Sequence, residues 1–336
     1  MRALPTGWKA VRRHLEFGQN REGWWLLMKS HYIPRFLLQK FVDGNGRVHC
    51  YRMRERKWFS STPENVGAEQ GLYRIEHEAV DDPDLLEKAY EFMESKAAPV
   101  IAEILRTGNI PDARDDLDIL ALFVVDSAFR VPASKEINEW IADEIAAGRV
   151  EVVGGEPVAA GIADGARPVA AINKFPGYIL PYLSGVCSKG AFLELRGFKW
   201  HLFRCAGTGD EALVTSDVPV GLHQIGPHPS GALSQLSLRP YVFRHWSLAS
   251  HVSVALSPSA ALVGARGGPL PWKNATAENV AAALNSMHCA YAHTIFSAND
   301  TPRFVSGNGR VTGAAKFADG AEQARQRNKL RVGLLP

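Results

Sequence analysis

The sequence predicts an α+β fold, in which helices and antiparallel strands occupy separate stretches of the chain. Three observations indicate this class. A hairpin pattern lies near residues 47–60, helical periodicity follows over 82–147, and short strands with a late helix come last, over 198–297. Strands and helices that are grouped in this way are typical of α+β domains rather than of a doubly wound parallel sheet.

The composition is that of an ordinary globular chain. Of its 336 residues, 46% are hydrophobic and 22% are charged, so the chain can bury a sizeable core. The formal net charge of +3 is too small to indicate nucleic acid or a membrane by itself. Basic residues crowd two segments, 47–57 and 325–331. Such clusters are more often solvated faces than binding patches.

The cysteines and apolar segments predict a cytoplasmic protein. No CxxC pair or zinc-ligand spacing occurs among Cys50, Cys187, Cys205 and Cys289, so we expect free thiols. The first 40 residues lack the pattern of a secretory signal. The longest apolar run, near 119–125, is too short to span a bilayer, which predicts no membrane partner.

Three parts are predicted along the chain. Residues 1–29 form a lead-in segment, 30–300 form a single α+β domain, and 301–336 form a C-terminal strand and a basic tail. The best internal boundary lies near 151–175, a stretch that is rich in glycine, alanine and proline. Its lack of periodicity predicts a linker or a long surface loop.

The domain begins with a short helix and a hairpin. Pro34 fits the first helical turn, where its missing N–H costs nothing. The turn sequence at 43–46 ends this helix and leads into paired strands at 47–53 and 57–60. The inward face of the helix is predicted to consist of Phe36, Leu37, Leu38 and Phe41. A further short turn opens at Thr62–Pro63 and stops near Gly71.

Three helices are predicted next. The first runs from residue 82 to Gly108, with a kink expected at Pro99. The second covers 112–130 and the third covers 135–147. Their apolar residues recur at helical spacing, which indicates that each helix buries one face.

The remaining elements are predicted from shorter patterns. A helix over 178–195 should be interrupted at Gly185 and Gly190, and the strand at 198–204 should pair with 212–215. Two more strands are expected at 251–256 and 260–263. A helix over 276–297 is predicted from one apolar stripe, formed by Val280, Leu284, Met287, Tyr291 and Ile295. The tail from Ala318 is polar and basic.

Familiar catalytic and cofactor motifs are absent from the sequence. There is no HExxH, no phosphate-binding loop and no GxSxG. The glycines at 307–313 have the wrong spacing for a dinucleotide turn. His223 and His228 are five residues apart in a loop, which makes a poor metal pair. The cofactor and the metal therefore stay unassigned, with a divalent cation as the candidate.

Polar residues at the start of the first helix are the first candidates for a site. His31 can act as a general acid or base, because its pKa lies near neutrality, or it can be a packing residue. Tyr32 is either a substrate-binding residue or a half-buried core residue. Arg35 can bind a phosphate or carboxylate through two hydrogen bonds, or it can simply be exposed.

Further candidates lie at a strand end and on two helices. Asp217 can serve as a base or a metal ligand, with Thr215 and Ser216 beside it to bind substrate. For this segment alone, a local turn with side-chain hydrogen bonds is the favoured interpretation. Arg130 either stabilises charge on a substrate or binds the carbonyls that end its helix. Asn285 binds either a substrate or the backbone of another segment.

Taken in order, these stretches resemble a bacterial family of unknown function that is defined by an N-terminal HYxP motif and a later TSDxP motif. The resemblance extends over about residues 30–300. Val218 stands where the family commonly has asparagine. The resemblance implies that the motif residues form a site, and it implies no reaction. The motifs are matched at 31–34, 62–73, 130–132 and 215–219.

Two functions from different classes follow. The leading hypothesis is a hydrolase that acts on a phosphate-bearing substrate, with nucleic acid or a nucleotide favoured. His31 would be the general acid or base, oriented by Asp217, and Arg35 or Arg130 would stabilise negative charge. The alternative is a non-catalytic binding or regulatory module, in which both motifs are structural latches. Convergence on an open cleft favours an enzyme, whereas burial with satisfied hydrogen bonds favours latches.

Overall fold

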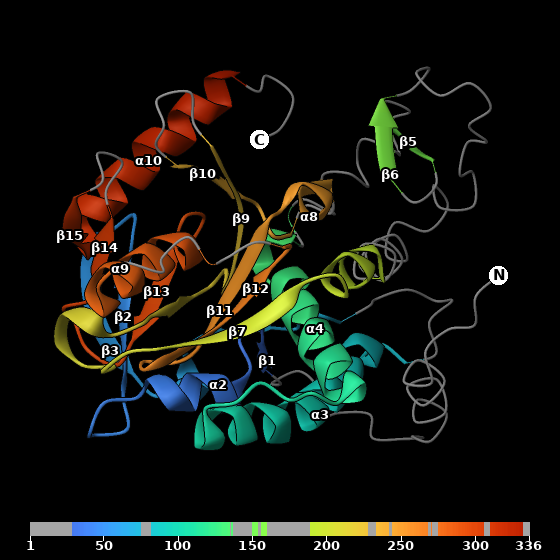
Figure 1. Cartoon of the computed structure of the whole chain (residues 1–336), viewed down its shortest axis with the longest axis horizontal. Coiled ribbons are helices and arrows are strands. Elements are labelled where there is room, and N and C mark those ends of the chain that lie inside the picture. The colour runs from blue at the N-terminus through green and yellow to red at the C-terminus, as the bar shows by residue number, and fades with distance from the viewer. Residues whose placement is uncertain are drawn as a thin grey trace.

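A computed structural model gives the arrangement of most of the chain (Figure 1). Helices and antiparallel strands make up these residues, which confirms the α+β class. In the part of the chain that the structure describes, no helix has the length and apolar character needed to cross a bilayer. The described residues are 29–74, 82–134, 136, 150–153, 156–159, 189–227, 233–241, 244–267, 270, 275–305 and 310–331.

A four-stranded antiparallel sheet contains the N-terminal hairpin. As predicted, β2 (Val48–Arg52) pairs with β3 (Lys57–Ser61). The order of the sheet is β3-β2-β13-β8, in which β13 (Thr294–Ser297) and β8 (Thr215–Ser216) come from the second half of the chain. The sheet therefore joins segments that are more than 150 residues apart in sequence.

The HYxP segment lies beside this sheet. A strand that was not predicted, β1 (Lys29–His31), pairs with β4 (Ala68–Gln70). Pro34 then precedes the short helix α2 (Arg35–Leu38), as expected from its fixed φ, and the chain continues into the 3₁₀ turn η2 (Gln39–Phe41). Leu37, Leu38 and Phe41 are fully buried, so the predicted inward face is confirmed. The turn predicted after Thr62 is η3 (Pro63–Asn65).

A five-stranded antiparallel sheet forms the centre of the second half. The predicted strands are present as β7 (Lys199–Arg204), β11 (His251–Ser257) and β12 (Ala260–Ala265). Two further strands, β9 (Val220–Pro227) and β10 (Leu233–Leu238), were not predicted, because glycine and proline in β9 are typical of a loop. The order of the sheet is β10-β9-β11-β12-β7.

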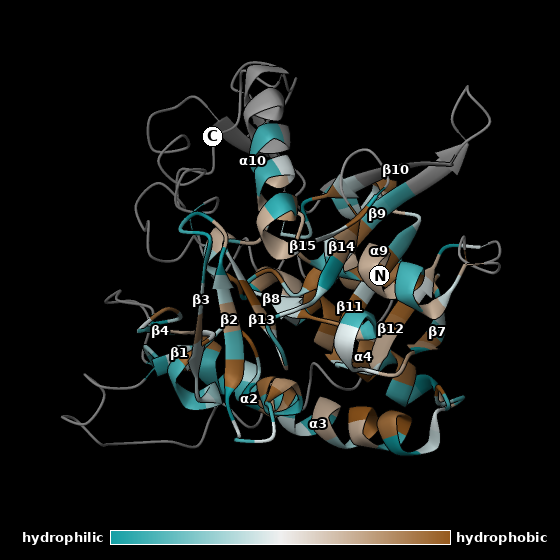
Figure 2. Cartoon of the chain, turned by 90° about the vertical axis from the view of Figure 1, so that its left-hand side faces the viewer, coloured by the Kyte–Doolittle hydropathy of each residue, from teal (hydrophilic) through white to brown (hydrophobic). Residues whose placement is uncertain are grey.

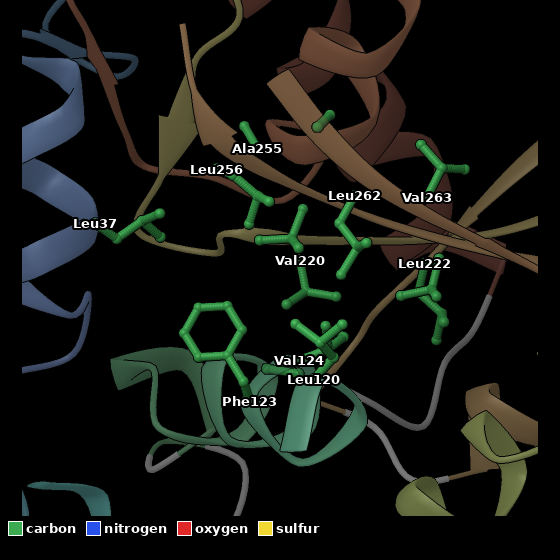
Figure 3. Close-up of a cluster of buried hydrophobic side chains, with 14 of the residues drawn as sticks. Leu37, Leu120, Phe123, Val124, Val220, Leu222, Ala255, Leu256, Leu262 and Val263 are labelled. Carbon is green, nitrogen blue, oxygen red and sulfur yellow. The ribbon is translucent and has the colours of Figure 1, made fainter. Parts of the chain in front are cut away.

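One face of this sheet is covered by helices. The predicted helices are α3 (Leu85–Thr107) and α4 (Arg114–Phe129), and α3 ends at Gly108 in the left-handed conformation that glycine favours. The α3 helix continues through Pro99. Figure 3 shows side chains of α4 packed against the sheet. The residues in this contact include Leu120, Phe123, Val124, Val220, Leu222 and Leu262.

The opposite face of the sheet is covered by α9 (Ala277–His288), which contacts β9 and β11. The Thr276 hydroxyl caps this helix by accepting a hydrogen bond from the Asn279 N–H. Downstream, β14 (Arg303–Val305) and β15 (Val311–Gly313) form a hairpin that leads into α10 (Ala314–Arg331). Residues 318–331 are therefore helical rather than a simple tail.

One strand pairing and one helix boundary predicted in the second half are wrong. Residues 212–215 do not pair with β7, whose neighbour is β12. The backbone there bonds other elements instead, since the Leu213 N–H donates to the Pro258 carbonyl at 2.8 Å. The predicted helix over 276–297 ends at His288, and Ile295 lies on β13. The predicted apolar stripe therefore combines residues of a helix with a residue of a strand. Hydrophobic periodicity alone does not show where the helix ends and the strand begins.

The predicted linker and the helix before it also need correction. The start of 151–175 contains a hairpin of β5 (Val150–Val153) and β6 (Glu156–Ala159), rather than a loop. Gly190 lies within a helical segment at 189–195, so the predicted interruption there is wrong. The lead-in up to residue 28 and almost all of the predicted helix over 135–147 lie outside the described residues.

The second half of the chain also contains a helical turn and a short helix. The turn η4 (Gly209–Glu211) follows β7, and α8 (Arg244–Leu248) precedes β11. Trp246 of α8 is fully buried and its indole N–H donates to the Pro240 carbonyl at 2.7 Å. This contact fixes the segment that connects β10 to β11.

Candidate functional site

Arg130 connects the HYxP segment to the helices. Its Nη1 donates to Glu94 Oε1 on α3 at 2.6 Å, and its Nη2 donates to the carbonyl oxygen of His31. Only 3% of the Arg130 side chain is exposed, so both acceptors are needed to compensate for the loss of hydration. Sequence reasoning expected Arg130 to bind the carbonyls of its own helix, whereas its guanidinium bonds two other segments.

Two tyrosines complete the surroundings of this guanidinium. The Tyr73 hydroxyl donates to the Arg130 carbonyl. The Arg130 guanidinium lies 4.8 Å from the centre of the Tyr90 ring and 5.8 Å from that of Tyr73. Aromatic faces attract a cation, and the attraction grows where water is excluded. Arg130 is therefore held from several directions, and the guanidinium is committed to the protein itself.

Three carboxylates that sequence reasoning missed lie around Arg130. Burial raises the pKa of Asp126 to about 7; the charge of Arg130 opposes this rise and that of Glu94 adds to it. Burial also raises the pKa of Glu87, while a hydrogen bond from Ser30 opposes the rise. The signal in the sequence is weak but present, since Glu87 and Glu94 are two helical turns apart and share one face of α3.

His31 has a ring nitrogen that is available for chemistry. Its Nε2 is buried and has no hydrogen-bond partner. Burial lowers the pKa of His31, and the charges of Arg35 and Arg130 lower it further. The Pro63 backbone and Glu64 partly oppose these effects. At neutral pH the imidazole is therefore uncharged and can accept a proton.

The neighbours of His31 in sequence point in different directions. Arg35 is exposed and forms an ion pair with Glu64, with 3.3 Å between Nη2 and Oε1. Tyr32 is partly buried, and burial followed by the negative charge of Asp217 raises the pKa of its phenol above its usual range. The influence of Asp217 on Tyr32 indicates that the HYxP and TSDxP segments approach each other at this phenol.

Asp217 bonds the backbone of the segment that enters β13. Its carboxylate accepts hydrogen bonds from the His293 N–H at 2.9 Å and from the Thr294 N–H at 3.0 Å. The Asp217 N–H donates in turn to the Thr294 carbonyl at 3.0 Å. The predicted partner, His31, interacts with Pro63. These interactions tie Asp217 to the start of β13 and His31 to Pro63. They do not join Asp217 to His31.

Ser216 and Thr215 are both fully buried, beneath the surface that a substrate could reach. The Ser216 hydroxyl lies 2.9 Å from the Val218 carbonyl and 2.8 Å from the His288 carbonyl, and it accepts a hydrogen bond from the Val218 N–H. The Thr215 hydroxyl has no hydrogen-bond partner. Ser216 therefore tightens the turn after β8 and ties it to the end of α9.

Asn285 connects three segments through one side-chain amide. Its Oδ1 accepts from the Val214 N–H at 2.9 Å, and its Nδ2 donates to the carbonyls of Ala212 and Arg303 at 2.9 and 3.0 Å. The residue is completely buried, so each of these bonds satisfies a backbone group that water does not reach. Of the two roles considered for Asn285, the structure supports the backbone role.

The site thus contains one group of residues that meet and several that do not. His31, Arg130 and the carboxylates of Glu87, Glu94 and Asp126 form one polar cluster between β1, α3 and α4. Within the described ranges, no three His, Cys, Asp or Glu side chains are arranged to hold a metal ion. The side chains of this cluster can exchange protons, whereas Ser216, Asp217 and Asn285 bond backbone groups of other segments.

Comparison with known proteins adds one finding. Residues 29–151 match the model of a family described as "Protein of unknown function (DUF4238)". The match includes the HYxP segment and the helices α3 and α4, which supply the whole polar cluster. The TSDxP segment and Asn285 lie beyond the matched residues. Neither the curated proteins nor the solved structures yielded a match to the chain.

The buried ion pair of Arg130 makes a direct prediction about stability. We expect Arg130→Leu to lower the free energy of unfolding by about 3 kcal/mol, because Glu94 and the His31 carbonyl lose their partner. Urea denaturation measures this change. Arg106→Leu is the matched control, since it breaks an exposed pair with Glu103 whose shortest distance is 2.5 Å. It should change stability little, and equal losses in the two variants would contradict the role of Arg130.

Proposed function

We propose that this protein is a nucleic-acid-binding module, whose HYxP and TSDxP residues stabilise the fold instead of performing a reaction. The observation that carries the proposal is the basic β2–β3 hairpin, whose tip packs against the first turns of α10. The two elements are about 260 residues apart in sequence, and the hairpin lies near the start of α10 in Figures 1 and 2. A cluster of basic residues on one element is the electrostatic footprint expected of a protein that binds phosphates.

Packing holds the two segments together. Tyr51, Met53 and Trp58 of the hairpin share an apolar cluster with Phe317 and Ala318 of α10. Within the hairpin, the ring centres of Tyr51 and Trp58 lie 5.0 Å apart. The apolar cluster that includes Phe317 and Ala318 holds the start of α10 against the hairpin. The basic hairpin therefore has a defined shape, which lowers the entropy lost on binding.

An ion pair also spans the junction. Arg56, at the tip of the hairpin, lies 2.5 Å from Asp319 of α10, measured between Nη2 and Oδ1. Arg56 lies in the turn with a positive φ of 53°. The pair is exposed and contributes little to stability. It shows that the tip of the hairpin reaches α10.

The charge of the hairpin is predominantly positive. Arg54 and Lys57 are exposed on the hairpin, and the first turns of α10 add the exposed Lys316 beside the acidic Asp319 and Glu322. Glu55 is the single acidic residue in the hairpin, and it pairs with Arg52. An extended basic surface fits the regularly spaced phosphates of a nucleic acid better than one small nucleotide.

The proposal predicts salt-dependent binding through the hairpin. Arg54→Ala with Lys57→Ala should weaken binding to DNA or RNA and reduce the slope of log K against log salt by about 1 for each side chain. Fluorescence anisotropy with labelled single-stranded and duplex oligonucleotides measures both. Lys40→Ala is the control, because Lys40 is exposed on η2, which directly follows α2, and α2 lies far from α10 in Figure 2. Binding that is absent in the wild type, or unchanged in the double variant, would contradict the proposal.

A second candidate, a hydrolase acting on a phosphate-bearing substrate, is favoured by one specific observation. His31 Nε2 is buried without a partner, close to Arg130, and Asp126 has a pKa of about 7. An uncharged imidazole and a carboxyl group that titrates near neutrality, each influenced by the charge of Arg130, are suited to proton transfer. We rank this function second, because Glu87 and Glu94 add negative charge beside Arg130 and disfavour an anionic substrate.

The hydrolase candidate predicts loss of turnover without loss of fold. His31→Gln and Asp126→Asn should each reduce cleavage of DNA, RNA or nucleotides by about 100-fold or more, as expected when a general acid or base is removed. The assay is run with Mg²⁺ and with EDTA. The control is His49→Gln, which changes a histidine that pairs with Asp43 on the hairpin side. No turnover by the wild type on any substrate would remove this candidate.

A further inference from the structure

The two faces of the five-stranded sheet differ in chemistry. Direct cross-strand partners point to the same side of a sheet. His223 of β9 is opposite His251 of β11, and Gly221 is opposite Ser253. Because side chains alternate along a strand, these four residues face α9, while Val220 and Leu222 face α4. The α9 side therefore contains polar, titratable groups in a position that is normally apolar.

The last residue of α9 completes this group. His288 Nε2 lies 3.0 Å from Ser253 Oγ, and His288 is 1% exposed. His223 is completely buried, and neither of its ring nitrogens has a hydrogen-bond partner. A buried polar group without a partner requires an explanation. The histidine cluster, defined as His223, His251 and His288, is therefore a candidate for a role beyond packing.

The cluster is too closely packed to bind a ligand. A Cβ atom at Gly221 would lie 2.8 Å from His223 Nε2, 2.9 Å from Ser253 Oγ and 3.2 Å from His288 Cδ2. These side chains occupy the space that glycine leaves, so a small molecule has no room between them. The described histidines also do not form the geometry of a metal site. What the cluster can still take up is a proton.

We propose that the histidine cluster is a pH-sensitive lock between α9 and the five-stranded sheet, closed while the three imidazoles are neutral and opened when they are protonated. A proton on any of them places a charge in a water-excluded site beside two other histidines. A protonated His223 would have no hydrogen-bond acceptor, because neither of its ring nitrogens has a partner. Protonation therefore favours a state in which α9 has moved away and water enters.

The groups that face the cluster offer little compensation for such a charge. On the sheet these groups are His201 of β7 and Ser253 of β11. Just before β11, the Ser250 hydroxyl lies 2.9 Å from His251 Nδ1. From the segment before β8, the Val214 backbone interacts with His288. On α8, His245 bonds the backbone of Arg239. None of these is a carboxylate.

The carboxylates closest in sequence to the cluster are placed elsewhere. Glu278 lies in the first turn of α9, at the opposite end of the helix from His288. Burial, and after it the charge of Asp217, raises the pKa of the Cys289 thiol, but the Asp217 carboxylate oxygens accept hydrogen bonds from the backbone at the start of β13. The strands β9, β10, β11 and β12 contain no Asp or Glu. A protonated His223 therefore meets no carboxylate on these strands.

The pKa values agree with this geometry. Burial lowers the pKa of His288 to about 4. Burial lowers the pKa of His223 well below its usual range, and His288 and His251 lower it further. A folded pKa below the unfolded one means that stability is complete above about pH 6.5 and is lost as the pH falls. Opening would release the bond from Ser216 to the His288 carbonyl and weaken the hold of Asn285.

The test compares the unfolding equilibrium at pH 7.5 and pH 5.5. For one histidine whose pKa is about 4 when folded and about 6.5 when unfolded, the unfolding constant rises about tenfold over this interval. His223→Leu should remove about one such factor, since it deletes a titrating group that makes no hydrogen bond. His49→Gln should keep the wild-type dependence. An equal dependence in wild type and His223→Leu would overturn the proposal.

A measurement on the wild-type protein makes the test independent of any variant. Histidine ring proton shifts, followed by NMR from pH 8 to pH 5, should show that His223 and His288 do not titrate while the protein is folded. Amide exchange over α9, corrected for its intrinsic pH dependence, should rise at pH 5.5 before that of β2. Ordinary titration of both histidines near pH 6.5, with α9 still protected, would overturn the lock.

Discussion

A buried guanidinium requires acceptors, and Arg130 finds them for Nη1 and Nη2, though not for Nε, in segments that are distant in sequence. It bonds the carbonyl of His31 on β1 and the carboxylate of Glu94 on α3, and it stacks near Tyr90. Because an unpaired charge in this position would be very costly, the three segments can adopt only arrangements that keep these contacts. The position of the HYxP segment follows from this constraint.

Asn285 and Asp217 play the same part in the second half of the chain. One amide satisfies the backbone of Ala212, Val214 and Arg303, and one carboxylate satisfies two N–H groups at the start of β13. Because the polar atoms of these side chains bond the protein backbone, we place binding on the basic hairpin beside α10. His31, whose Nε2 has no partner, is the exception, and it keeps a hydrolytic function open to experiment.

Local signals in the sequence predicted the elements that local chemistry determines. Pro34 marked the start of α2, and Gly108 marked the end of α3. The strand β9 was missed because the sheet and α9, not its own sequence, stabilise it around Gly221. Of the candidate site, the sequence indicated His31 and Arg130 but not the carboxylates. Their pKa values depend on contacts between α3 and α4, which no single segment encodes.

The account depends most on the claim that the TSDxP segment is a latch. Native-state hydrogen exchange of wild type and Asp217→Ala tests this claim directly. We expect the amides of His293 and Thr294, which donate to this carboxylate, to lose protection first, with destabilisation spreading along β13. Nucleic-acid binding through the hairpin should persist while the protein stays folded. Unchanged protection of both amides, together with lost binding or turnover, would contradict the account and return Asp217 to a functional site.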